Sequence, residues 1–125
     1  MNERAKKVIL IVDDDLALLE ALELMLRGKY EVVKLTNGKE AVKTYRNIRP
    51  DLVLTDIVMP EMDGIETTKE ILKIDPNAKI VGITAYSQSR GKDLINAGAK
   101  EIIEKPFTRR RLIEVIEKYL QKVPE

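Results

Sequence analysis

Short apolar runs rich in Val and Ile alternate along the chain with longer segments in which apolar residues recur at helical spacing. This alternation is typical of repeated βα units around a parallel sheet. It predicts strands near residues 7–12, 30–35, 51–55, 79–84 and 101–104, and helices near residues 15–27, 38–47, 64–74, 87–97 and 108–122. The central strands are apolar almost throughout, as expected when helices cover both faces of a sheet. With right-handed crossovers, these elements form an open, doubly wound α/β domain.

Composition restricts the chemistry that the chain can perform. There is no cysteine and no histidine, which excludes disulfides, thiolate or imidazole metal ligands and a histidine base. The 22 basic and 21 acidic side chains leave a net charge of +1, so the overall field gives no reason to expect nucleic acid or an anionic membrane as a partner. Any chemistry must therefore depend on oxygen atoms and lysine.

Length and hydropathy give expectations about organisation and location. The 125 residues fit one domain, and we expect a single domain over residues 1–125, with its core near 7–122 and no room for a second one. The first residues are polar and charged, and no apolar segment is long enough for a signal peptide or a membrane span. We therefore expect a cytoplasmic protein.

Polar residues follow the apolar runs at the carboxyl ends of four predicted strands. Asp13 and Asp14 follow the first run, Asp56 follows the third, Thr84 ends the fourth and Lys105 follows the fifth. Open parallel sheets bind ligands at this edge, where the acids would meet and require a cation. Attack of a carboxylate on a phosphoryl group brings anions together, so its catalysis depends on a metal ion and an ammonium group that neutralise charge. The three aspartates, the threonine and the lysine at this edge therefore predict an aspartyl phosphorylation site.

The motifs around these positions resemble the receiver domain of two-component response regulators. They are Val12-Asp13-Asp14, Asp56 with Met59-Pro60 and Met62-Asp63-Gly64, Thr84-Ala85, and Lys105-Pro106-Phe107. Each fragment is weak alone, but all of them in this order and spacing are highly specific. The resemblance covers essentially the whole chain and is nearest to free-standing, CheY-like receivers. It implies a five-stranded, flavodoxin-like sheet with strand order 2-1-3-4-5.

The resemblance also implies roles and partners. Asp56 would accept a phosphoryl group from a sensor histidine kinase or a phosphotransfer protein, Thr84 would hydrogen-bond that group, and Lys105 would ion-pair with it. The chain would catalyse only its own phosphorylation and dephosphorylation, so it would not be an enzyme with turnover. We expect a monomer that changes its binding surface for a downstream protein.

A Mg²⁺ site is a further implication of the resemblance. Its ligands would be the carboxylates of Asp13, Asp14 and Asp56 and the backbone carbonyl of Val58. Mg²⁺ prefers oxygen ligands and retains several waters, so this donor set suits it.

Three positions depart from the common receiver pattern. Ile102 stands where many receivers carry an aromatic residue, so we expect Thr84 to move toward the phosphoryl group while Ile102 repacks, as a modest population shift. Val58 and Tyr86, two residues beyond Asp56 and Thr84, do not readily orient a hydrolytic water. We therefore expect a long-lived phosphorylated state.

The first predicted helix has more apolar surface than a core-facing helix needs. Its polar stripe consists only of Glu20, Glu23 and Arg27, which leaves an apolar arc of roughly 220°. One hypothesis is that the surplus docks the helical bundle that carries the donor histidine, and the alternative is that the last helix covers it. The Arg109–Arg111 run at the start of that last helix is either a solvated face or a site for an acidic partner.

Alternative interpretations remain at the sequence level. Asp13 and Asp14 could be helix caps, although Asp15 is the expected cap of the first helix. A haloacid-dehalogenase-type phosphohydrolase would use Asp13-Asp14-Asp15 as its Asp-x-Asp motif, but it needs a late acid pair that residues 106–109 do not offer. A pseudo-receiver would keep the fold without phosphorylation, and a nucleotide-binding module would need a Gly-rich loop. The isomer of the Lys105-Pro106 bond is open.

Overall fold

The computed structural model describes residues 6–85 and 90–120, and within them strands and helices alternate along the chain. The strands are β1 (Val8–Val12), β2 (Glu31–Leu35), β3 (Leu52–Thr55), β4 (Ile80–Thr84) and β5 (Glu101–Glu104). The helices are α1 (Leu16–Leu26), α2 (Gly38–Ile48), α3 (Gly64–Ile74), α4 (Arg90–Ala97) and α5 (Arg109–Leu120). Each predicted element is present, with boundaries within one residue of the prediction, except that the predicted ends at 87 and 122 lie outside the described residues.

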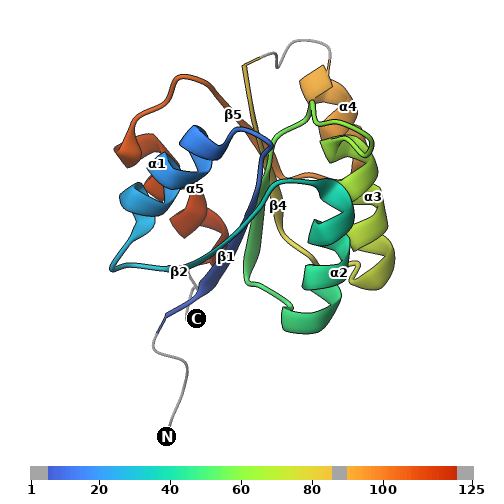
Figure 1. Ribbon diagram of the computed structural model, residues 1–125, viewed down its shortest axis with the longest axis horizontal. Helices are drawn as coiled ribbons and strands as arrows, with labels where there is room; N and C mark the ends of the chain where they lie inside the picture. The colour runs from blue at the N-terminus through green and yellow to red at the C-terminus, as the bar shows by residue number, and fades with distance from the viewer. Residues whose placement is uncertain (1–5, 86–89, 121–125) are drawn as a thin grey trace, which may run out of the picture.

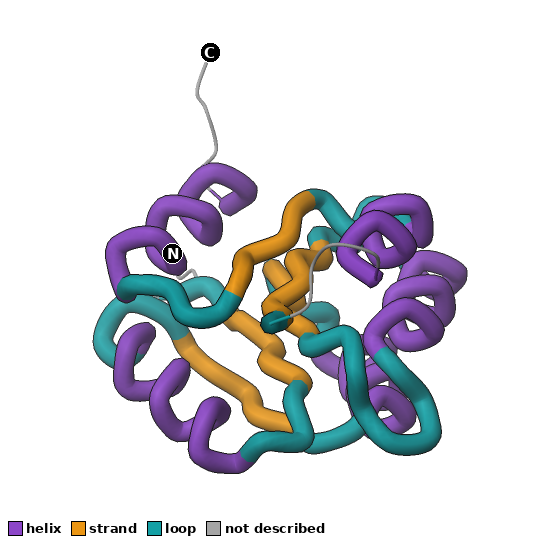
Figure 2. Tube along the Cα trace, turned by 90° about the horizontal axis from the view of Figure 1, so that it is seen from above, coloured by secondary structure: helices purple, strands orange, loops and turns teal. Residues whose placement is uncertain are grey.

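The five strands form one parallel sheet in the order β2-β1-β3-β4-β5, which confirms the expected topology. The chain runs from β1 outward to β2 and then returns past β1 to β3, so the direction of winding changes between β1 and β3. Figure 1 shows the consequence, with α1 and α5 on one face of the sheet and α2, α3 and α4 on the other. Seen from above in Figure 2, the sheet lies between two layers of helices.

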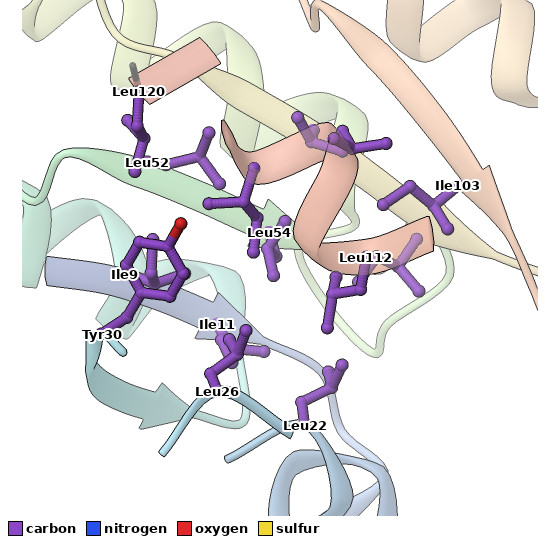
Figure 3. Packing of buried hydrophobic residues seen from close by; sticks show 14 of the residues in the cluster. Ile9, Ile11, Leu22, Leu26, Tyr30, Leu52, Leu54, Ile103, Leu112 and Leu120 are labelled. Carbon is purple, nitrogen blue, oxygen red and sulfur yellow. The ribbon is translucent and has the colours of Figure 1, made fainter. Parts of the chain in front are cut away.

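Two apolar cores result from the alternation of side chains along each strand. Ile9 and Ile11 of β1 point toward α1 and α5, in the cluster that Figure 3 shows, while Leu10 and Val12 belong to the cluster beneath α2, α3 and α4. Both faces of the central strands are therefore apolar, as predicted. No helix among the described residues has the length and hydropathy needed to cross a bilayer.

Strand register determines which polar residues meet at the carboxyl edge. Val12 pairs with Thr55, so Asp13 and Asp56, the next residue on each strand, are neighbours across the change in winding direction. The Asp56 amide donates to the Val12 carbonyl at 2.9 Å, which extends this register by one residue. Thr84 pairs with Glu104, and Lys105 follows directly.

Candidate functional site

Three carboxylates gather at this edge of the sheet. Asp13, Asp14 and Asp56 each offer a carboxylate oxygen within 4.8 Å of the other two. Asp13 and Asp56 are only 2% and 9% exposed, whereas Asp14 is exposed. The structure therefore brings together the three acids that the sequence singled out, two of them largely removed from solvent.

Local hydrogen bonds hold two of these carboxylates in place. One Asp13 oxygen (Oδ1) accepts from the Asp15 amide, and one Asp56 oxygen (Oδ1) accepts from the Ile57 amide, each at 2.8 Å. Asp15 itself caps α1 by accepting from the amides of Ala17 at 3.0 Å and Leu18 at 3.3 Å. The cap of α1 is thus Asp15, as expected, and helix capping does not account for Asp13 and Asp14.

Lys105 and Thr84 complete the edge. The Lys105 ammonium lies 3.6 Å from Asp13 Oδ2, and the Lys105 amide donates to the Thr84 carbonyl at 2.9 Å. The Thr84 side chain is buried, with 1% exposure, at the end of β4. The Lys105-Pro106 peptide bond, which the sequence left open, is cis.

The electrostatics of the site favour an added cation. Burial, followed by the charge of Asp13, raises the pKa of Asp56 from 3.8 to about 6, although Lys105 acts against this shift. Burial also raises the pKa of Asp13, against a hydrogen bond from Asp15 and the charge of Lys105. Both shifts mean that ionisation of these carboxylates is less favourable in the folded protein than in water. A hard divalent cation on the three carboxylates would relieve it, and an all-oxygen donor set fits Mg²⁺.

The loop between β3 and α3 packs against the backbone of Asp56. The Gly64 amide donates to the Ile57 carbonyl at 2.7 Å, and a β-carbon at Gly64 would collide with the Asp56 carbonyl oxygen. This close approach explains why glycine follows Asp63 in the motif. Asp63 caps α3 by accepting from the Glu66 amide at 2.9 Å.

One polar contact of this loop was missed in the sequence. Arg90, the first residue of α4, forms an ion pair with Asp63, with 2.9 Å between its guanidinium and Asp63 Oδ2. No local sequence motif predicts this ion pair, because it depends on how α3 and α4 pack side by side.

The remaining predicted positions lie around the site. Ile102 is half-buried against the cluster beneath α2, α3 and α4, and a β-carbon at Gly82 would collide with both Ile102 and Leu94 of α4. The Val58 side chain is 55% exposed on the loop after Asp56. Tyr86, the other residue assigned to phosphoryl lifetime, lies outside the described residues.

Part of the surplus apolar surface of α1 is covered by the last helix, and part of it is exposed. Leu18 and Met25 pack against the cluster that includes α5, so this part is covered as the second alternative expected. Leu16 and Leu24 remain 66% and 62% exposed. Two apolar side chains of α1 are therefore exposed and available to a partner.

The Arg109–Arg111 run at the start of α5 mostly has partners within the chain. Arg109 donates to the Met25 carbonyl near the end of α1 at 2.8 Å, and Arg111 lies 3.2 Å from a Glu101 carboxylate oxygen. These contacts favour a structural role over recognition of an acidic partner.

Comparison with known proteins agrees with this geometry. The family model described as response regulator receiver domain matches residues 9–117. The chain is 46% identical to the chemotaxis protein CheY of Thermotoga maritima over 115 residues, which cover 90% of this chain and 96% of that protein. The crystal structure of the CheX-CheY-BeF3-Mg complex from Borrelia burgdorferi is similar, with a TM-score of 0.85, 31% identity and coverage of 93% of this chain and 90% of that one.

A second solved structure resembles the chain equally well in fold. It is the receiver domain of the sensor histidine kinase PA1611 from Pseudomonas aeruginosa, solved with a magnesium ion coordinated in its active site cleft. The TM-score is 0.89 at 29% identity, covering 94% of this chain and 100% of that chain. The structures of related domains thus contain Mg²⁺.

Proposed function

This chain belongs to the response regulator receiver domain family, and on that premise we propose that Asp56 is its phosphoacceptor. Receivers of this CheY-like kind take part in two-component signalling as phosphoacceptors and are not classical enzymes. The observation that carries the proposal is the cluster of Asp13, Asp14 and Asp56 beside Lys105, at the edge of the sheet where the winding direction changes.

Asp56 is suited to the nucleophilic role by its surroundings. Its Oδ1 atom accepts a hydrogen bond from the Ile57 amide, which leaves Oδ2 for attack on phosphorus. The new bond joins Oδ2 to phosphorus, while the bond from phosphorus to the donor nitrogen or oxygen breaks and the leaving group keeps its electron pair. Because the pKa of Asp56 is about 6, the carboxylate is predominantly ionised and ready to attack at neutral pH.

The two other polar residues would act on the transferred group. Lys105 would ion-pair with the phosphoryl oxygens, since its ammonium already lies within reach of Asp13 at the same edge. The Thr84 hydroxyl would donate a hydrogen bond to one of these oxygens. Both contacts stabilise the negative charge that the transferred phosphoryl group brings to the acceptor side of the reaction.

Mg²⁺ would be held by the carboxylates of Asp13, Asp14 and Asp56 and by the backbone carbonyl of Val58. When bound, the ion would neutralise the clustered charge and polarise the phosphoryl oxygens. The raised pKa values of Asp13 and Asp56 support this assignment, because burial and, at Asp56, the charge of Asp13 disfavour the ionised carboxylates, and a bound cation would offset both effects. The Mg²⁺ ions in the two related structures support it as well.

Phosphorylation would be transmitted through Thr84 and Ile102. If Thr84 is drawn toward the phosphoryl group, Ile102 gains space to repack beneath α4, where it already meets Leu94 over Gly82. We propose that this population shift changes the surface of the domain for a downstream protein. The net charge of +1 offers no support for nucleic acid as that target, and we propose that the receiver acts as a monomer.

The phosphoryl donor would be a sensor histidine kinase or a phosphotransfer protein that docks on α1. Leu16 and Leu24, which lie two turns apart with Glu20 between them, are the exposed apolar side chains of this proposed docking patch. Leu16→Glu and Leu24→Glu variants should slow phosphotransfer from the kinase but not from acetyl phosphate. Ile48→Glu on α2, also at an exposed apolar position, is the matched control. Unchanged kinase transfer in folded Leu16 and Leu24 variants would contradict docking at this patch.

Binding of beryllofluoride, which mimics a phosphoryl group on a carboxylate, tests the proposed site directly. A ¹⁹F NMR titration should detect a bound species in wild type that requires Mg²⁺ and is lost in Asp56→Asn. Beryllofluoride binding that persists in the Asp56→Asn variant, or that is unchanged when EDTA removes Mg²⁺, would exclude Asp56 as the phosphoacceptor.

A further inference from the structure

The peptide group between Asp56 and Ile57 is hydrogen-bonded at both of its ends. Its N–H donates to Asp56 Oδ1 at 2.8 Å, and its carbonyl accepts from the Thr55 hydroxyl at 2.9 Å. The bond is trans, so the N–H and the C=O point in opposite directions. One planar group therefore has the proposed phosphoacceptor's carboxylate at one end and the Thr55 side chain at the other.

Thr55 is a polar residue in an otherwise apolar strand. It ends β3 after Leu52, Val53 and Leu54, and it is 1% exposed. A carbonyl oxygen can only accept, so the Thr55 hydroxyl is the donor of this bond. Valine suits a strand as well as threonine does, so strand formation does not account for the hydroxyl.

The Asp56 carbonyl is enclosed by the loop that leads to α3. A β-carbon at Gly64 would collide with this carbonyl oxygen, so the start of α3 covers it closely. The Gly64 amide donates to the next carbonyl, that of Ile57, at 2.7 Å. Within residues 6–85 and 90–120, no backbone amide donates to the Asp56 carbonyl. The Thr55 hydroxyl therefore satisfies a carbonyl that would otherwise be costly to bury.

Two effects connect the Thr55 hydroxyl to the Asp56 carboxylate. Because the peptide is planar, any turn of its carbonyl turns its N–H as well, and a hydrogen bond weakens as its alignment is lost. A donor on the carbonyl also polarises the amide, which strengthens the N–H as a donor. The Asp56 amide is held separately by the Val12 carbonyl at 2.9 Å, so this peptide is the remaining adjustable support of Oδ1.

We propose that Thr55 is a positioning residue for phosphoryl transfer, because its hydroxyl holds the peptide whose N–H fixes Asp56 Oδ1 and so directs Oδ2 at phosphorus. The proposal rests on the function proposed above. Thr55 acts through the peptide and not on the phosphoryl group itself. Its distinctive consequence is that the hydroxyl at position 55, and not the bulk of the side chain, determines how fast Asp56 is phosphorylated.

The experiment compares Thr55→Val and Thr55→Ser with wild type. Valine keeps the branched shape and loses the hydroxyl, whereas serine keeps the hydroxyl and loses a methyl group. The rate of phosphorylation by acetyl phosphate and the affinity for beryllofluoride are measured at saturating Mg²⁺. We expect both to fall about two- to ten-fold in Thr55→Val, the range that one hydrogen bond supports, and to stay close to wild type in Thr55→Ser. A role in packing alone would reverse this order, because serine leaves a cavity.

The NMR resonance of the Ile57 amide proton reports on the same contact without any phosphoryl group. A hydrogen bond to a carboxylate moves an amide proton downfield, so Thr55→Val should move this resonance upfield and Thr55→Ser should leave it near its wild-type position. Thr68→Val is the matched control, because Thr68 is a buried threonine of α3 whose hydroxyl has no hydrogen-bond partner among the described residues. It should keep both the wild-type rate and the wild-type Ile57 resonance.

A second pair of variants covers the case in which Thr55→Val does not fold. Thr55→Cys and Thr55→Ser have nearly the same shape, but the thiol is the weaker donor, so the cysteine variant should be phosphorylated more slowly. Wild-type rates in the folded valine or cysteine variant, a serine variant slower than the valine one, or an unmoved Ile57 resonance in Thr55→Val would each overturn the positioning role. If wild type neither binds beryllofluoride nor is phosphorylated, the proposed function itself is wrong. If wild type does both and the Thr55 variants match it, only the role of Thr55 is wrong.

Discussion

The acid cluster should make the protein less stable at neutral pH than it would be without the charge of Asp56. The folded state holds a proton on Asp56 more tightly than the unfolded chain does, because the pKa is about 6 against an ordinary 3.8. The resulting loss of folding stability is absent at pH values below the pKa of the unfolded state, grows between the two pKa values and is complete above the pKa of the folded state. Asp56→Asn removes this cost and can still accept the hydrogen bond from the Ile57 amide.

The size of the effect follows from the shift. A difference of about two pKa units, at roughly 1.4 kcal/mol per unit, corresponds to about 3 kcal/mol at neutral pH. Since Asp56 is only 9% exposed, solvent screening removes little of this value. For a domain of this size the gain is roughly 10 °C in melting temperature. Near pH 4 most Asp56 side chains remain protonated in the folded state, so the gain should fall to below about 1 kcal/mol.

Urea unfolding of wild type and Asp56→Asn at about pH 7 and about pH 4, in EDTA, measures this difference. Asp93→Asn is the control, since Asp93 is an exposed carboxylate of α4 whose ion pair with Arg90 is 4.0 Å long, and it should change stability little at either pH. Equal stability of wild type and Asp56→Asn at pH 7, or a gain of the same size at both pH values, would refute the argument that ionisation of the buried Asp56 costs stability.

Three further predictions concern single contacts. Gly64→Ala should lower the free energy of unfolding by more than about 2 kcal/mol and slow phosphorylation by acetyl phosphate, because the added methyl group collides with the Asp56 carbonyl; wild-type values in both assays would contradict the close packing. Tyr45→Phe should cost about 1 to 2 kcal/mol in urea unfolding, because the Tyr45 hydroxyl donates to Asp75 at 2.7 Å and joins the ends of α2 and α3; an unchanged midpoint would show that this bond adds nothing. Val58→Asn should shorten the lifetime of the phosphorylated protein, because the amide can orient a water that valine cannot; decay of the ³²P label at the wild-type rate would contradict this.

The fold and most of the site could be predicted because they depend on local pattern and strand register. Apolar residues on both faces of β1 require helices on both faces of the sheet, and parallel pairing of Val12 with Thr55 brings Asp13 beside Asp56. The resemblance to receivers supplied the strand order, which periodicity alone does not determine. The position of Asp15 as a cap is a consequence of short-range rules. Lys105 reaches Asp13 because all the strands end at one edge of the sheet, although β3 and β4 lie between their two strands.

Contacts between helices could not be predicted, because they depend on how the helices rotate and cross. The sequence indicated surplus apolar surface on α1, but not that Leu18 would be covered while Leu16 and Leu24 stay exposed. Likewise, the pairing of Arg90 with Asp63 needs α3 and α4 to start side by side. Long arginine side chains reach partners many residues away, and no spacing in the sequence encodes that choice.

Phosphate-affinity electrophoresis after incubation with acetyl phosphate tests the central claim most directly. Wild type should give a slower-migrating species in Mg²⁺ and none in EDTA, and Asp56→Asn should give none in either. Asp13→Asn should lose the species through lost Mg²⁺ and regain part of it at high Mg²⁺ concentration, which separates a ligand from the nucleophile. A shifted species that persists in Asp56→Asn would contradict the assignment of Asp56 as the phosphoacceptor.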